Sequence, residues 1–168
     1  MDAITDTQVR ASFVNATRGE AKRINLPDLD AQPWAELDFL GWVDPKAPQQ
    51  AYLVAPGIAG TPAADRPTGV KLRRNNAGFG GGTRMCSICC TVHPASGVTL
   101  MVAPRAGKAG RDGNTVGIDV CSDLRCSGYV RGWAPLPPIS RIGETTSVDD
   151  KVARLLVNLE TFLRRVQR

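Results

Sequence analysis

Five cysteines are the residues of this 168-residue chain whose spacing best fits a defined chemistry. Cys86 and Cys89 form a CxxC pair, and Cys121 and Cys126 form a CxxxxC pair. Folding can bring two such pairs together, and Zn²⁺ accepts four thiolates in a tetrahedron at about 2.3 Å. The spacing therefore predicts one zinc ion held by these four cysteines.

A site of four thiolates is structural rather than catalytic, because no coordination position is left for water. Two other interpretations compete with zinc: free thiols that cluster by chance, or a thioredoxin-like redox pair at Cys86 and Cys89. The redox interpretation requires a βαβ unit, whereas the pattern downstream is strand, loop, strand. We therefore expect a structural Zn²⁺.

Four further residues lie close enough in sequence to affect the metal. Cys90 adjoins a ligand and is expected to be a packed thiol that points elsewhere. His93 precedes a proline in a turn, and we expect it to face solvent or to be hydrogen-bonded; the alternative is contact with a metal ligand. Four thiolates and Zn²⁺ carry a net charge of about −2, which Arg84 and Arg125 can offset.

The remaining residues offer little for catalysis. The chain has a single histidine, and we find no Ser-His-Asp set, no HExxH motif and no paired carboxylates in a cleft-like context. General acid–base chemistry therefore has few candidate groups. These observations favour a protein that is not an enzyme.

Composition indicates a folded domain with an aliphatic core. Hydrophobic residues make up 42% of the chain and aromatic residues only 5%, while 17 glycines and 12 prolines predict many loops. No apolar run is long enough to cross a membrane. Asp2 and Asp6 give the start the wrong charge for a secretory signal. We expect a cytoplasmic protein, where structural disulfides are disfavoured.

Two helical segments are predicted before the first strand. Residues 5–24 have apolar residues at helical spacing, and Thr5 and Gln8 fit a capping box. A second, short helical segment is expected over 34–40, ending at Gly41.

Strand patterns follow in the middle of the chain. A loop at 56–68 and a glycine-rich turn at 75–83, which lacks the Lys-Ser/Thr of a phosphate loop, separate them. A basic loop is expected at 104–114. The predicted strands are 50–55, 68–74, 97–103 and 115–120.

The C-terminal segment is predicted to be an amphipathic helix capped by Ser147. We expect its apolar stripe to pack on its own domain; the alternative is a helix lying on a membrane surface. The stripe consists of Val152, Leu155, Leu156, Leu159, Phe162, Leu163 and Val166.

Three stretches around the cysteines resemble the C-terminal treble-clef domain of the elongation factor G-binding proteins, the FusB-type fusidic-acid resistance family. They read RMCSIC from Arg84, GRDGNTVG from Gly110 and CSDLRCS from Cys121. The upstream stretches LDFLGW from Leu37 and YLV from Tyr52 also resemble proteins with that domain.

The resemblance implies an α+β fold, with a small antiparallel sheet and a treble-clef-like zinc finger flanked by an N-terminal and a C-terminal α-helix. Residues 1–48 are expected to be a helix and connector, 49–140 the zinc-binding core, and 141–168 a helix packed on that core. The implied ligands are the four paired cysteines; the last position, Cys126, can be histidine in the family.

The resemblance also implies a function in translation. Family members bind elongation factor G and help to release it from a ribosome stalled by the drug. The resistance proteins have an additional N-terminal helical bundle, whereas this chain has room for one of its helices, so we do not extend the expectation to drug protection. We expect a monomer that binds elongation factor G, alone or on the ribosome.

A basic surface beside the zinc site is the expected partner-binding face, with a solvated loop as the alternative. Local positive charge and an amphipathic tyrosine ring suit a protein partner. The residues of this predicted face are Arg105, Lys108, Arg111, Arg125, Tyr129 and Arg131.

RNA or ribosomal RNA is the alternative partner. Net charge is +5, with the basic excess in the middle and at the C-terminus, and arginines suit phosphates. Against RNA, the chain has few aromatic residues for stacking on bases. Binding to phosphates is expected to weaken steeply with salt, whereas a protein interface loses less.

Overall fold

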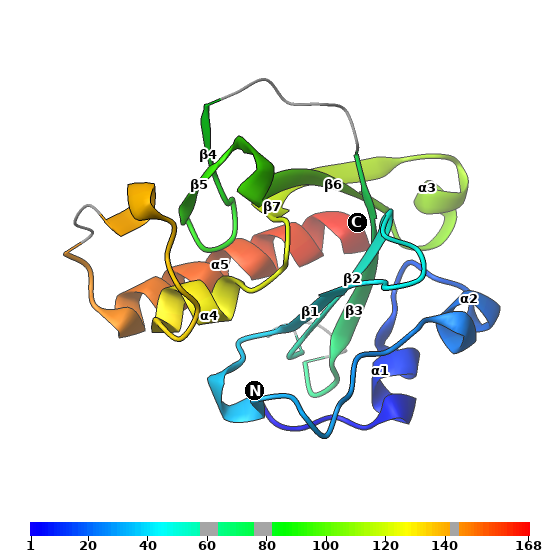
Figure 1. The fold of residues 1–168 in the computed structure, drawn as a ribbon. Helices are drawn as coiled ribbons and strands as arrows, with labels where there is room; N and C mark the ends of the chain where they lie inside the picture. The colour runs from blue at the N-terminus through cyan, green and yellow to red at the C-terminus, as the bar shows by residue number, and fades with distance from the viewer. Residues whose placement is uncertain (58–63, 76–81, 142–144) are drawn as a thin grey trace.

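A five-stranded antiparallel sheet forms the centre of the computed structural model, which describes residues 1–57, 64–75, 82–141 and 145–168 (Figure 1). The strand order is β1-β2-β3-β6-β7, and a separate two-stranded sheet is made by β4 and β5. The strands are β1 (Leu40–Val43), β2 (Gln50–Ala55), β3 (Thr68–Arg74), β4 (Thr83–Met85), β5 (Val92–Pro94), β6 (Val98–Pro104) and β7 (Thr115–Cys121).

Five α-helices and three short 3₁₀-helices complete the described part of the chain. The α-helices are α1 (Asp6–Ser12), α2 (Arg18–Arg23), α3 (Gly107–Arg111), α4 (Cys126–Arg131) and α5 (Val148–Gln167). The 3₁₀-helices are η1 (Trp34–Glu36), η2 (Ala95–Gly97) and η3 (Pro138–Arg141). The fold is α+β with a small antiparallel sheet and helices at both ends, as expected.

The four predicted strands are confirmed to within a residue or so, because each is a short apolar or alternating run between turn residues. Along β3, Val70 and Leu72 are buried while Arg73 is exposed, as the alternation predicts. The intervening loop at 58–63 and the glycine-rich segment at 76–81 lie outside the described residues, so the predictions for them are untested.

The helix α5 packs across one face of the sheet and encloses the larger core. Its residues Leu155, Leu159 and Phe162 are buried with Val70 and Leu72 of β3 and with the inward residues of β6 and β7. Ser147 caps α5 by accepting a hydrogen bond from the Asp150 amide at 3.1 Å. Leu156 is the exception in the predicted stripe, since it is exposed.

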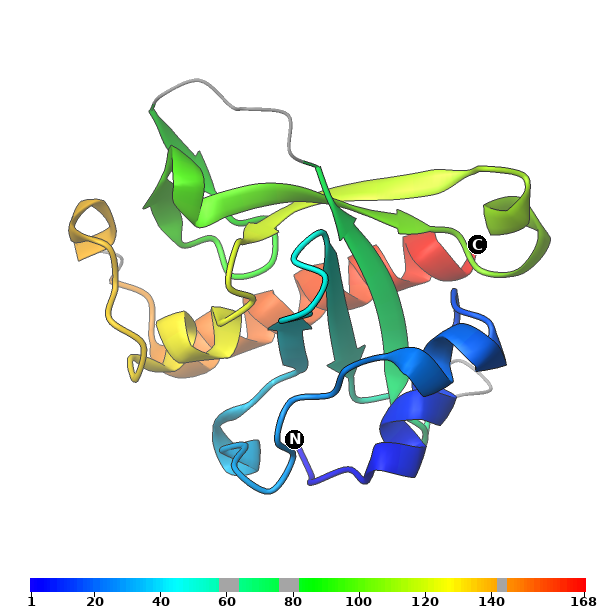
Figure 2. The same ribbon diagram turned by 45° about the vertical axis from the view of Figure 1, so that its right-hand side comes forward.

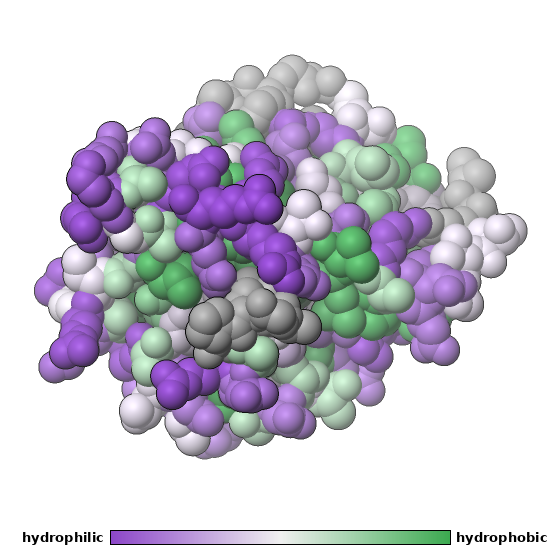
Figure 3. All heavy atoms as spheres, turned by 180° about the vertical axis from the view of Figure 1, so that it is seen from behind, coloured by the Kyte–Doolittle hydropathy of each residue, from purple (hydrophilic) through white to green (hydrophobic). Residues whose placement is uncertain are grey.

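Packing of α5 on its own sheet confirms the core interpretation of this helix over the membrane interpretation. Among the described residues, no helix combines the length and apolar character that crossing a membrane requires. Viewed from behind in Figure 3, hydrophobic patches are separated by hydrophilic side chains.

The single N-terminal helix predicted over 5–24 is wrong: the segment forms α1 and α2 with an extended break between them. Phe13 pairs with Gly69 of β3, and Val14 donates a backbone hydrogen bond to the Gly69 carbonyl at 2.9 Å. A Cβ on Gly69 would overlap the Ser12 hydroxyl, so only glycine permits this approach. Thr17 then caps α2 with Glu20, which restarts the helix.

The break positions α1 and α2 against the other face of the sheet. Val9, Ile24, Trp42, Tyr52 and Val54 form a second, smaller core there. The inward and outward residues of β2 are therefore both buried, which explains why its sequence is apolar without a clear alternation.

Two other predictions need correction. The helical segment expected over 34–40 is only the 3₁₀-helix η1, because Leu40 already pairs with Val54 as the first residue of β1. The loop expected at 104–114 contains the short helix α3.

Candidate metal centre

Two hairpins and one helix bring the four paired cysteines together. Cys86 and Cys89 lie in the turn between β4 and β5, Cys121 is the last residue of β7, and Cys126 is the first residue of α4. A knuckle turn, a β-hairpin and a following helix that each supply ligands form a treble-clef arrangement.

The sulfur geometry fits a tetrahedral zinc ion. All four sulfurs are buried and lie within 4.8 Å of one another. Cys86 Sγ lies 3.7 Å from Cys126 Sγ, and Cys89 Sγ lies 3.5 Å from Cys121 Sγ. Ligands at about 2.3 Å from a tetrahedral ion are about 3.8 Å apart. The four cysteines therefore fit one structural Zn²⁺.

The turn between β4 and β5 directs backbone amides at the first cysteine. The amides of Ile88 and Cys89 point to Cys86 Sγ at 3.4 and 3.5 Å, which stabilises a thiolate there. Cys90 closes the turn by donating its amide to the Cys86 carbonyl at 2.9 Å, with a positive φ of 61°. The second turn has its own left-handed residue, Leu124, at φ 58°.

The pKa values of the clustered thiols are shifted in opposite directions. Hydrogen bonds from Cys121, Cys126 and Cys89 lower the pKa of Cys86 far below its ordinary value. Hydrogen bonds with Cys121, Cys86 and Cys89 raise the pKa of Cys126. Zinc stabilises all four groups as thiolates, so metal uptake releases protons from this cluster.

His93 contacts the metal centre rather than solvent. Its ring is buried, and Nε2 lies 3.3 Å from Cys121 Sγ. Burial lowers the pKa of His93. Because a zinc-bound thiolate has no proton to give, Nε2–H is the donor to Cys121. Of the expected environments, the solvent-facing one is wrong: the ring is hydrogen-bonded, and its partner is a ligand cysteine.

The ring of Tyr129 holds His93 in this position. The two rings meet edge to face, with centroids 4.9 Å apart. Tyr129 donates its hydroxyl hydrogen bond to Asp123 Oδ2 at 2.7 Å, and burial, together with that bond, raises the pKa of the tyrosine. This line of contacts links both cysteine turns to α4.

The arginines near the cysteines have other partners. Arg84 forms an ion pair with Asp119 of β7 at 2.8 Å, which fastens β4 to the sheet. Arg125 is exposed, with its guanidinium 5.3 Å from the centre of the Trp133 ring.

Cys90 is half-buried, and the side-chain amide nitrogen of Asn158 lies 3.8 Å from its sulfur. Its thiol faces α5, away from the other four, as expected.

The six residues predicted to form one partner-binding face lie in two groups. Arg105, Lys108 and Arg111 are at α3, which meets the C-terminal end of α5 through the Ala106 amide and the Val166 carbonyl. The second group, Arg125, Tyr129 and Arg131, is at α4, near the other end of α5 (Figures 1 and 2). The helix α5 between the two groups is about 30 Å long, and partner binding by either group stays a prediction.

The second group also includes a residue that forms an ion pair within the fold. Arg131 forms an ion pair with the buried carboxylate of Asp38 at 2.7 Å. The Asp38 amide donates to Ser127 Oγ at 2.9 Å, so two contacts join the segment between η1 and β1 to α4. Of this group, Arg125 remains on the surface.

Sequence reasoning missed three residues that support the centre. Thr91 Oγ1 lies 3.2 Å from Cys89 Sγ. Asn158 of α5 donates to the Ile88 carbonyl at 3.0 Å, and the Asp119 carbonyl accepts the Ser87 amide at 2.7 Å. Asn158 and Asp119 are distant from the knuckle in sequence, and no local signal identifies them. Thr91 could have been considered from its position two residues after Cys89.

A comparison with protein families identifies the arrangement. The family model described as "FBP C-terminal treble-clef zinc-finger" matches residues 8–166, which is nearly the whole chain. No curated protein and no solved structure matches the chain.

Proposed function

Because the chain belongs to the FBP C-terminal treble-clef zinc-finger family, we propose that it is a non-enzymatic binding module that binds elongation factor G and modulates translation. The family match, combined with a complete set of four metal-binding cysteines, is the observation that carries this proposal. A partner of this kind places the protein in the cytoplasm, where we propose that it acts as a monomer on the free factor or on the factor–ribosome complex.

Zinc has a structural role in this proposal. Cys86, Cys89, Cys121 and Cys126 occupy all four coordination positions, so the ion supplies folding energy rather than an activated water. Its coordination would fix the two cysteine turns relative to α4 and β7. A rigid core of this kind suits the presentation of a binding surface.

The group at α3 is the better of the two candidate partner surfaces. Lys108 is 84% exposed, and Arg111 is also exposed. Among the described residues, the ion pair of Lys108 is with Asp112 in the same turn, an interaction worth little in water. Long cationic side chains on a short helix can therefore rearrange to meet acidic groups of a partner.

Binding of purified elongation factor G by the zinc-loaded chain tests this function. We expect the double variant Lys108→Glu with Arg111→Glu to bind at least about tenfold more weakly than wild type. The matched control is Arg18→Glu with Lys22→Glu, two exposed cations on α2, which should bind like wild type. Absence of binding by the wild-type chain would reject the factor as the partner.

RNA is a second candidate, favoured by one specific observation. The Ala106–Val166 hydrogen bond places the cations of α3 beside the arginine-rich end of α5. Two sources of positive charge on one end of the molecule suit phosphates. Affinity for ribosomal RNA that falls steeply with salt, with no affinity for the factor, would favour RNA over the protein partner.

A further inference from the structure

On the outer edge of β7, some backbone groups have no hydrogen-bond partner among the residues that the structure describes. β7 is the last strand of the sheet, paired on one side with β6. The Arg105 amide donates to Asn114, and the Ser122 amide donates to Gly97, both at 2.9 Å. These bonds fix the phase of the ladder: the amides and carbonyls of 116, 118 and 120 face β6, and those of Thr115, Gly117 and Asp119 face outward.

One hydrogen bond already uses this edge. The Ser87 amide, in the cysteine turn, donates to the outward carbonyl of Asp119 at 2.7 Å. Within the part of the chain that the structure describes, no other backbone hydrogen bond reaches Thr115 or Gly117 from outside the sheet. Outward backbone donors and acceptors therefore continue along β7 from Asp119, which binds Ser87, to Gly117 and Thr115.

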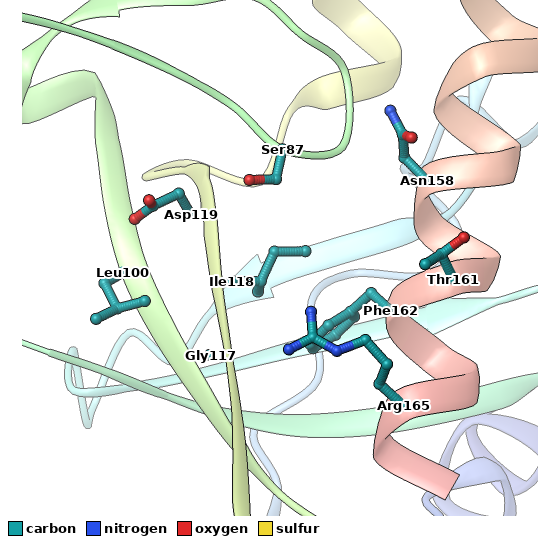
Figure 4. A pocket seen from close by; sticks show the side chains of 9 residues that line it. All are labelled: Ser87, Leu100, Gly117, Ile118, Asp119, Asn158, Thr161, Phe162 and Arg165. Carbon is teal, nitrogen blue, oxygen red and sulfur yellow. The ribbon is translucent and has the colours of Figure 1, made fainter. Parts of the chain in front are cut away.

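A cavity of about 360 Å³ lies along the same edge, between β7 and α5. Figure 4 shows Gly117 and Asp119 on the strand, Asn158, Thr161 and Arg165 on the helix, and Ser87 above the space between them. Side chains of Ile118 and Phe162 supply apolar surface within it. Gly117 has no side chain to obstruct a segment that approaches the strand.

The charged side chains that line the cavity indicate which kind of side chain a bound segment would carry. Asp119 is paired with Arg84, whereas the Arg165 guanidinium has no ion pair or hydrogen bond with any residue that the structure describes. Arg165 is exposed and lines the cavity. Its planar guanidinium is suited to bind a carboxylate with two hydrogen bonds.

We propose that β7 is a docking edge, at which an extended segment of a protein partner adds as a further strand and places an acidic side chain against Arg165. Backbone pairing with Thr115 and Gly117 supplies affinity, and the cavity beside α5 selects side chains. The inference rests on the proposed function in treating the chain as a protein-binding module, and it does not depend on which protein is bound.

Substitution of Gly117 provides a sharp test. Proline at this position removes the outward amide and leaves the β6 ladder intact, because that amide does not face β6. The matched control is Gly117→Ala, which also adds a Cβ near Leu100 Cδ1, at 3.2 Å, but keeps the amide. Zinc content and circular dichroism establish that both variants fold.

The probe is a displayed library of random linear dodecapeptides, selected on the zinc-loaded wild-type chain. We expect selected peptides to be rich in acidic residues, to bind G117A like wild type, and to bind G117P about tenfold more weakly. Arg165→Glu should weaken binding similarly, and Arg168→Glu should not. Failure to select peptides, or equal binding to G117P, overturns the proposal.

A second measurement covers the case in which G117P does not fold. Amide hydrogen exchange of the wild-type chain should slow at Gly117 and Thr115 when a selected peptide is added; unchanged exchange there overturns the proposal. Binding of elongation factor G to wild type and to G117P tests the two proposals separately. Binding of the factor to G117P as to wild type rejects β7 as its docking edge, whereas no binding to wild type rejects the factor.

Discussion

His93 Nε2 lies 3.3 Å from Cys121 Sγ, so the only histidine of the chain supports a zinc ligand instead of acting as one. The ring donates a hydrogen bond to a thiolate and thereby reduces the negative charge on the sulfur. Tyr129 holds the ring from the other side. A group outside the coordination shell therefore contributes to the affinity of the site.

Replacement of His93 by leucine should weaken zinc binding about tenfold or more, because the donor to Cys121 is lost while the volume is retained. Competition against a chromophoric chelator measures the change. His93→Gln, which can keep a donor, should lose less. Equal affinities for wild type and H93L would show that the hydrogen bond does not tune the metal.

The fifth cysteine provides an internal control for the other four. Cys126→Ser should abolish stable zinc binding and leave the chain largely unfolded, because the buried site loses a ligand. Cys90→Ser should retain one zinc ion and a cooperative unfolding transition, since the Cys90 sulfur faces Asn158. Metal analysis and thermal unfolding followed by circular dichroism distinguish the two. Loss of zinc from C90S would require a different ligand set.

Arg131 should contribute to the free energy of unfolding through its ion pair with Asp38. Its ion pair with Asp38 involves a carboxylate whose side chain is only 4% exposed. Arg131→Met leaves that charge buried without its partner and is expected to cost roughly 3 kcal/mol of unfolding free energy. Arg125→Met, on the exposed surface, should change stability by less than about 0.5 kcal/mol. Denaturant unfolding of the zinc-loaded proteins measures both.

Glu20 should contribute a stability that depends on pH. Hydrogen bonds from Lys71 and Thr17 lower its pKa from 4.5 to about 2. A depressed pKa in the folded state stabilises the fold above the unfolded-state pKa, and this contribution is lost as pH falls from about 4.5 toward 2. The stability difference between wild type and Glu20→Gln should therefore begin to shrink as the pH approaches 4.5 from above. Excess zinc is kept in both samples, and the comparison extends down only to the pH at which both proteins still unfold cooperatively, because loss of zinc unfolds the chain. A difference that stays constant down to that limit would contradict the assignment.

The part of the fold that could be predicted from sequence has local causes. The cysteine spacing indicates a zinc site, the runs at 50–55 and 68–74 indicate strands, and Ser147 with an apolar stripe indicates α5. Each signal lies within a few residues of the element it specifies. The break between α1 and α2 has a local signal too, the second capping box of Thr17 and Glu20, which a continuous helical pattern obscures.

The rest depends on contacts between distant segments. Leu40 begins a strand only because β2 lies beside it. His93 reaches Cys121, and Arg131 reaches Asp38, across long stretches of sequence. The basic groups at α3 and α4 are close in sequence but lie near opposite ends of α5. Spacing along the chain could not reveal these relationships, because tertiary packing creates them.

Metal content of the purified chain, measured by native mass spectrometry with circular dichroism before and after chelation, tests the central claim most directly. We predict one zinc ion per chain, and loss of the folded structure when the ion is removed, because zinc binding and folding are coupled. A chain that is folded and metal-free as isolated, or that keeps its structure after complete removal of zinc, would contradict this account.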